Sequence, residues 1–131
     1  MTVGVNPVIA DMILDSLFSG AAWTPPAASY VQLHTGDPGV AGTASVSSYA
    51  TRTVLAWSPS AAGSKSISAP VTITASWAGA SPETISHVSY WDSPAGGTFI
   101  ISDQLVAAVT VITGSPVTIP SLTAPVSPVA A

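Results

Sequence analysis

Hydrophobic and polar residues follow two different periods along this chain, one near the N-terminus and another farther on. Over residues 7–19 the apolar side chains recur at helical spacing, while two aspartates share the polar side. Asn6 can cap this segment, Pro7 fits the first helical position, and Gly20 can end the helix by taking the left-handed conformation. The pattern therefore predicts one helix over about residues 7–19, and this helix must bury one face.

From Tyr30 onward apolar and polar residues alternate, and short segments rich in β-branched residues are separated by Gly, Pro, Ser or Asp. The candidate strands are YVQLHT, TRTVLAWS, PVTITASW, ISHVSYWD, GTFIISDQL and AVTVIT. This arrangement is typical of an antiparallel β-sandwich of roughly seven or eight strands. We predict a mainly β fold, Ig-like or jelly-roll-like, over about residues 29–123, with the N-terminal α-helix packed across it. The predicted core consists of Ile9, Ile13, Leu17, Val31, Leu33, Leu55, Trp57, Ile73, Val88 and Ile101.

The length of 131 residues fits a single domain, residues 1–131. About residues 120–131 carry closely spaced prolines, which predict an extended tail that is either docked or mobile. No charge occurs from Leu105 onward, but the prolines exclude a helix that could span a membrane. The N-terminus lacks the basic and continuously apolar regions of a signal peptide, so export by that route is not expected.

Charged residues make up 6% of the chain, against about 25% in an ordinary soluble domain. A surface so poor in charge suits a protein whose outer faces other protein covers. The chain has two cations and a net charge of −4, which argues against nucleic acid as a partner. Cysteine is absent, so disulfides and thiolate chemistry are excluded.

Two histidines raise the question of a metal site or of acid–base catalysis. His34 lies three residues before Asp37, and His87 lies five before Asp92, but none of the usual metal-ligand spacings is present. We expect instead that Asp37 closes the HTGDPG turn through an Asx-type hydrogen bond and that His34 donates to a backbone carbonyl. No metal, cofactor or catalytic residue is predicted. No serine lies in a GxSxG motif, and GGTF fits a hairpin connection better than a phosphate loop.

The remaining candidate positions are structural or interfacial. Arg52 begins a strand, and we expect it to pair with Asp37, Asp92 or Asp103 and to hold a loop in place. The alternation assigns Trp57, Trp77 and Trp91 to the core, with Trp91 on the same face as Ile85. Tyr90 and Trp91 point to opposite faces of their strand, so one of them is expected at a surface or an interface. The candidate structural or interface residues are Asn6, His34, Asp37, Arg52, His87, Tyr90, Trp91 and Asp92.

Several segments together resemble small structural proteins of tailed bacteriophages, especially those of actinobacterial hosts, that are labelled minor tail or tail-fibre-type proteins. They are NPVIADMILDSLF, YVQLHTGDPGVAGT, YATRTVLAW and ISHVSYWDSPAGGTFIISDQL, which cover about residues 5–105 in order. The resemblance implies a virion component without catalytic activity, assembled in the host cytoplasm and in contact with copies of itself and with other virion proteins.

Two alternatives stay open at this point. One is a capsid decoration or minor capsid protein of the same kind of phage, in contact with the major capsid protein. The other is a host-surface adhesin module that holds glycan with its aromatic side chains. A membrane partner is not expected.

Overall fold

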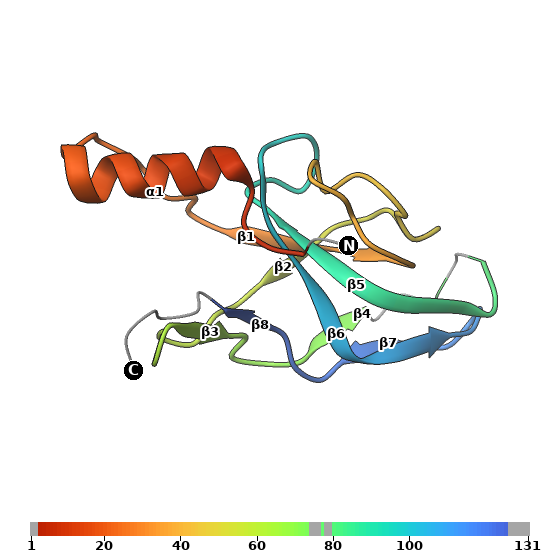
Figure 1. Ribbon diagram of the computed structural model, residues 1–131. Helices are drawn as coiled ribbons and strands as arrows, with labels where there is room; N and C mark the ends of the chain where they lie inside the picture. The colour runs from red at the N-terminus through yellow and green to blue at the C-terminus, as the bar shows by residue number, and fades with distance from the viewer. Residues whose placement is uncertain (1–2, 74–76, 78–79, 126–131) are drawn as a thin grey trace.

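The computed structural model describes residues 3–73, 77 and 80–125 (Figure 1). Within this part of the chain there are one helix and eight strands. They are α1 (Pro7–Ser19), β1 (Ser29–His34), β2 (Thr53–Leu55), β3 (Ser64–Ser66), β4 (Val71–Ile73), β5 (Glu83–Trp91), β6 (Phe99–Val111), β7 (Val117–Ile119) and β8 (Thr123–Pro125).

All strand pairs are antiparallel, and the strands form three sheets. The largest has the order β2-β1-β5-β6, and the two smaller sheets pair β3 with β8 and β4 with β7. Figure 1 shows β3, β8, β4 and β7 together below the large sheet, in the second layer of a sandwich. The predicted mainly β, antiparallel fold with one helix is confirmed, and the strand number falls within the predicted range.

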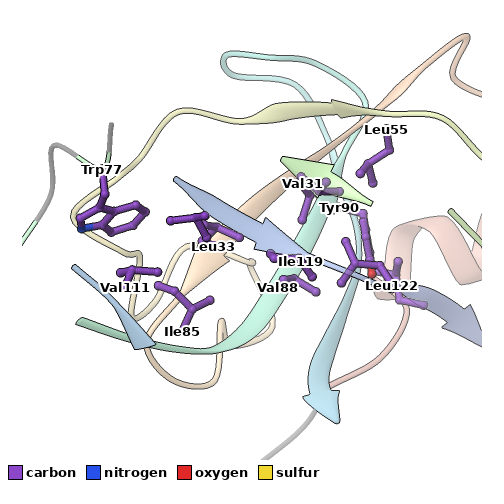
Figure 2. Close-up of a cluster of buried hydrophobic side chains, with 13 residues drawn as sticks. Val31, Leu33, Leu55, Trp77, Ile85, Val88, Tyr90, Val111, Ile119 and Leu122 are labelled. Carbon is purple, nitrogen blue, oxygen red and sulfur yellow. The ribbon is translucent and has the colours of Figure 1, made fainter. Parts of the chain in front are cut away.

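The core lies between the large sheet and the smaller sheets. Figure 2 shows side chains from both layers converging there, and the aromatic ring of Trp77 closes one end. The buried cluster consists of Val31, Leu33, Leu55, Val71, Trp77, Ile85, Val88, Tyr90, Ile101, Val111, Val117, Ile119 and Leu122. Burial of so many apolar side chains is the main stabilising contribution to a domain of this size.

An irregularity in the β5–β6 pairing accompanies a change in which residues of β5 enter this core. The register with β6 shifts between Ile85 and His87, so the alternation of faces shifts with it. As a result Ile85, Val88 and Tyr90 all belong to the core cluster. The prediction that Trp91 shares a face with Ile85 was therefore wrong, because alternation does not run unbroken from Ile85 to Val88.

Five residues of the predicted core lie in the main cluster, namely Val31, Leu33, Leu55, Val88 and Ile101. Ile9 is buried at the start of α1, Trp57 packs half-buried against the cluster, and Ile13 is half-buried. Leu17 was predicted wrongly, since 71% of its side chain is exposed. The side chain of Ile73 lies outside the described part of the structure.

Helix α1 begins and ends as predicted but does not pack across the sandwich. The Asn6 side chain caps it by accepting from the Val8 N–H, and Gly20 ends it with φ 66°. Its one buried residue is Ile9, and Figure 1 shows the helix extending away from the sheets. A helical period shows which residues share a face, but not whether the fold covers that face.

The C-terminal residues contribute more to the sheets than predicted. β7 pairs with β4, β8 pairs with β3, and Leu122 between them is buried. Of the tail predicted for about residues 120–131, β8 (Thr123–Pro125) is extended and docked on β3. Residues 126–131 lie outside the described part of the structure, so the prediction for that half of the tail stays a prediction.

A loop between β1 and β2 covers the second face of the large sheet. Val46 forms a bridge with His34, and the Ser47 N–H donates to the Leu33 carbonyl at 3.0 Å. Gly42 lies directly over Phe99, with φ 69°, and a Cβ atom there would come within 2.5 Å of the ring. The loop therefore needs glycine at this position to lie so close to the sheet.

Candidate functional site

The second face of the large sheet carries a buried layer of polar side chains under the β1–β2 loop. Across β1, β5 and β6 the register forms two rows, Gln32–Ser89–Ser102 and His34–His87–Gln104. Five of these six side chains, all except Gln104, are buried although polar, and so is the nearby Ser47. Buried polar groups are costly unless they are hydrogen-bonded. The partners of these side chains therefore show whether the layer is free to bind a ligand or serves to hold the loop on the sheet.

His34 links the loop to the sheet. Its Nδ1 lies 2.7 Å from the Ala44 carbonyl oxygen, and its Nε2 lies 2.7 Å from the Ser89 hydroxyl. A carbonyl can only accept, so Nδ1 carries the proton and Nε2 accepts from Ser89. The Trp91 Nε1–H then donates to Ser89 Oγ at 2.8 Å. Burial, as the largest cause, lowers the pKa of His34, so the imidazole is held neutral.

A serine hydroxyl in contact with a histidine nitrogen is also the pairing that a nucleophilic serine requires. Here, however, His34 and Ser89 are both 0% exposed, and the Ser89 oxygen already accepts from Trp91. A substrate cannot reach this hydroxyl. The pair therefore ties the loop to the sheet, as expected for a His34 that donates to a backbone carbonyl.

The two histidines face each other across β1 and β5. The Nδ1 of His87 lies 2.8 Å from the Ser86 hydroxyl, and its Nε2 is buried without a hydrogen-bond partner among the described residues. Both ring nitrogens of His34 are already bonded. The described residues contain no group of three or more His, Cys, Asp or Glu side chains that could hold a metal ion.

Arg52 holds a loop in place, but by other contacts than those predicted. Its guanidinium carbon lies 3.7 Å from the centroid of the Trp91 ring. Its hydrogen bonds run to the Gln32 side chain and to the carbonyls of Ser93 and Gly96. We predicted a carboxylate partner, whereas these three hydrogen bonds run to neutral oxygens. Burial lowers the pKa of Arg52, and the neighbouring negative charge of Asp92 opposes that shift.

Tyr90 and Trp91 point to opposite faces as predicted, but neither lies at the surface. Tyr90 is 1% exposed in the core, and Trp91 is 6% exposed beneath Arg52. The loop covers the face that the alternation alone would leave open. The Tyr90 hydroxyl is buried without a hydrogen-bond partner among the described residues, and burial raises its pKa.

Asp37 and Asp92 each close a turn. The Asp37 carboxylate accepts from the Gly39 N–H at 2.9 Å, which confirms the predicted Asx-type bond. The Asp92 carboxylate accepts from the Thr98 N–H at 2.6 Å across the β5–β6 hairpin. Gly96 and Gly97 have φ of 62° and 74°, which confirms that GGTF belongs to a hairpin connection.

Glu83 is a structural residue that the sequence reasoning missed. Its carboxylate accepts from the Ser47 hydroxyl at 3.0 Å, the Ser48 N–H at 3.0 Å and the Ser48 hydroxyl at 2.8 Å. Burial opposes its charge, but these bonds outweigh burial and lower the pKa of Glu83. A signal was available, because Glu83 is the single glutamate of a chain with few charges and the loop is rich in serine.

Asn6 joins α1 to the edge of β6. Its Oδ1 accepts from the Val8 N–H at 2.9 Å, and its Nδ2 donates to the Phe99 carbonyl at 2.7 Å. Its backbone N–H donates to the Ile100 carbonyl at 2.8 Å. The first turn of the helix is thus fixed to the large sheet, while the rest of the helix makes few contacts with it.

The surface of α1 is strongly apolar. Phe18 and Leu17 are 82% and 71% exposed, and Val8, Met12 and Leu14 are exposed as well. With 13 residues α1 is too short to cross a membrane, and no helix in the described ranges is long and apolar enough to do so. Apolar patches of this kind usually mark an interaction site.

An apolar groove of about 490 Å³ opens between the connector before β1, the large sheet and the β3–β8 sheet. Trp57 stands in its wall with its Nε1–H donated to the Ser29 hydroxyl. Lys65 is the charged side chain among the described residues that line it. The lining residues are Pro26, Ala27, Ala28, Ser29, Leu55, Trp57, Lys65, Tyr90, Ile100, Ile101 and Ala124.

The chain is similar to a known family of phage proteins. The family model of the podophage GP4 fiber I protein gp80 matches residues 5–126. The chain belongs to this family. No curated protein matches the chain.

Membership in the gp80 family implies a structural component of tail-fibre type that is located in the virion and associates with other virion proteins. The resemblance drawn from the sequence is confirmed to that extent, and its restriction to phages of actinobacterial hosts stays a prediction. The buried polar layer agrees with a structural role, since its side chains are engaged with one another and with loop backbone.

Proposed function

We propose that this chain is a non-enzymatic structural subunit of a phage tail fibre or minor tail structure, assembled through contacts with copies of itself and with other virion proteins. The observation that carries the proposal is the match of residues 5–126 to a phage fibre family. The exposed apolar surface of α1 supports it, because a subunit buried in an assembly can present such a surface.

The absence of catalysis is part of the same proposal. The pair most similar to a catalytic arrangement, Ser89 with His34, is sealed from solvent and bonded on every side. We also propose that residues 1–131 form one domain, since the core cluster draws side chains from β1 through to the segment before β8.

A glycan-binding function finds little support in the placement of the aromatic side chains. Trp77, Tyr90 and Trp91 are buried, and Arg52 lies over the Trp91 ring. A sugar platform needs aromatic faces that are open to solvent. The structural role is therefore the proposal that the geometry favours.

The test is to locate the chain in purified particles. A small tag fused to the chain, imaged by cryo-microscopy with a tag-binding antibody fragment, should label the tail. Label on the capsid shell would support a decoration protein instead, and absence of the chain from particles would overturn the proposal. Particles from an untagged phage, treated with the same antibody fragment, are the control.

A further inference from the structure

Helix α1 presents a stripe of apolar side chains that the rest of its own chain leaves open. Leu14, Leu17 and Phe18 are spaced so that they lie together on one helix surface, and all three are exposed. Asn6 fixes the first turn, while the remainder extends beyond the sheets (Figure 1). The helix is thus held in a position where another molecule can reach it.

The acidic residues of α1 lie at one border of this stripe. Asp15 precedes Phe18 by three residues, and Asp11 precedes it by seven, so both carboxylates are on the Phe18 side. The helix carries no cation. A surface that accepts this helix should therefore combine an apolar hollow with a positive charge nearby.

The groove beside Trp57 and Lys65 has these properties. Its volume of about 490 Å³ is in the range that holds a drug-sized ligand, so it can accept several apolar side chains of a helix. The Lys65 ammonium donates to the Ser58 carbonyl at 2.9 Å and has three N–H groups in all, so it can also bond a carboxylate. Arg52, the other cation of the chain, is engaged with Trp91.

We propose that α1 of one copy docks into the groove of a second copy, with Leu14, Leu17 and Phe18 in the hollow and its aspartates near Lys65. This inference rests on the proposed assembly function and names its contact. The charges favour a second copy as the occupant, because the acidic helix and the basic groove are complementary and occur in the same chain. The mode is that of an amphipathic helix in an apolar groove.

Docking of the helix into the groove of its own chain is disfavoured by its attachments. Asn6 bonds both Phe99 and Ile100, so the first turn would have to leave β6 before the helix could move. The connector that follows the helix also forms part of the groove wall, from Pro26 to Ser29. Contact between copies is heterologous, with the helix of one subunit meeting a different surface of the next, so subunits can be joined in a row or a ring.

The test measures self-association of the full chain by sedimentation over a range of concentrations. The wild type should associate, and the helix variant Leu14→Ser/Phe18→Ser should raise the dissociation constant at least about tenfold, as expected when an aromatic anchor is removed. The groove variant Ala27→Trp should do the same by filling the hollow. Val106→Ser and Ala27→Ser are the matched controls and should associate like the wild type. Val106 is exposed and belongs neither to α1 nor to the groove lining, and serine at position 27 is too small to fill the groove.

Mixing the two variants gives the decisive result. The helix variant retains an intact groove and the groove variant retains an intact helix, so the mixture should form a complex at concentrations where each variant alone is mostly monomeric. Lys65→Glu should weaken association, and adding Asp11→Lys and Asp15→Lys in the same chain should restore it. Far-UV circular dichroism should be unchanged, because the altered helix side chains are more than half exposed.

Three results would overturn the inference. They are a wild type that stays monomeric, association that persists in the groove variant, and a mixture that forms no complex. The first would mean that the helix binds its own groove or a different protein, and the second would indicate helix–helix pairing. Failure here is distinct from failure of the proposed function, since the tagged chain can still be found in particles when it does not self-associate in solution.

Discussion

At the scale of single residues, the buried polar layer shows how few partners fix the β1–β2 loop to the sheet. His34 bonds loop backbone on one side and Ser89 on the other, and Trp91 completes the chain of donors. Each bond contributes about 0.5–1.5 kcal/mol, but leaving one partner buried and unpaired costs about 1–3 kcal/mol. A substitution in this layer should therefore lower the free energy of unfolding mainly because it leaves a buried polar group without its hydrogen-bond partner.

The neutral state of His34 makes stability depend on pH. Its pKa is lowered in the folded protein, so below about pH 6.5 the unfolded chain takes up a proton that the folded chain refuses. The free energy of unfolding should fall as the pH drops from 6.5 toward the folded pKa, and should not change from this cause above pH 7. Urea denaturation at pH 7.5, 6.5 and 5.5 measures it.

The matched variant for this prediction is His34→Gln, which should lose the slope between pH 6.5 and 5.5. The pKa of Glu83 is also lowered, so Glu83 likewise makes the free energy of unfolding fall as the pH drops. Because a carboxylate titrates below a histidine, this stabilisation is lost only at more acidic pH. Burial raises the pKa of Asp103, which gives the opposite sign. The difference between wild type and variant isolates His34, and equal slopes in both would contradict the assignment.

Arg52 should stabilise the β5–β6 hairpin loop through its ring contact and its two carbonyl bonds. We expect Arg52→Ala to lower the free energy of unfolding by about 1–3 kcal/mol, from the lost cation–π contact and charged hydrogen bonds. Arg52→Lys should recover only part of this loss, because an ammonium lacks the planar fork. Chemical denaturation measures both, and a Lys variant as stable as the wild type would show that charge alone is sufficient.

At the scale of elements, α1 differs from the strands because its order depends on its N-terminal cap and its attachment to β6 rather than on core packing. The strands lie in sheets that enclose the core, whereas α1 buries one residue, Ile9. An isolated helix of 13 residues is marginal in water, so the cap and the attachment to β6 contribute a large part of its order. The helix should therefore respond to changes at Asn6 more than the sheets do.

We expect Asn6→Ala to increase hydrogen exchange of the α1 amides at least about fivefold, which corresponds to the loss of about 1 kcal/mol for a missing cap. The thermal midpoint of the sheets should change little. Asn6→Ser is the matched control, since serine caps the Val8 N–H but does not supply the amide donor that reaches Phe99. Equal exchange in Asn6→Ala and wild type would show that the cap is unimportant.

At the scale of the whole molecule, the two layers depend on chain segments that are far apart in sequence. β3 pairs with β8 and β4 pairs with β7, so the C-terminal strands complete sheets begun in the middle of the chain. Leu122 adds a buried side chain between them. The second layer is therefore assembled only when the C-terminal residues are in place.

Truncation separates the part that belongs to the fold from the residues beyond it. A chain that ends at Leu122 lacks β8 and should be about 1–3 kcal/mol less stable than one that ends at Pro125, since the β3 backbone loses its partners. Equilibrium unfolding compares the two. Equal stability would mean that the β3–β8 pairing adds nothing.

The Pro125 truncation also tests the role of the C-terminal residues in assembly. We expect fewer copies of this chain in particles, because the removed residues 126–131 carry no charge and can be covered by another protein at little desolvation cost. Quantitative immunoblotting of purified particles measures the copies. Incorporation at the wild-type level would show that the contact lies elsewhere.

The sequence by itself determined the local features of this protein. Asn6, Pro7 and Gly20 set the ends of the helix, and Asp37 set its turn, because capping and turn bonds involve residues only a few positions apart. Alternation and turn residues likewise located β1, β2, β4 and β5. The segments GTFIISDQL and AVTVIT were predicted as two strands but form the single strand β6, and β3 and β8 were not predicted. The distinctive segments also led to the phage structural family that the match over residues 5–126 supports.

The tertiary structure alone decided which faces are covered. The irregularity after Ile85 places His87 and Trp91 on the face opposite to the one that unbroken alternation predicts, and the β1–β2 loop covers that face. Leu17 has the spacing of a core residue, yet it is 71% exposed. Periodicity fixes the direction of a side chain relative to its neighbours in sequence, whereas burial depends on segments brought together from far along the chain.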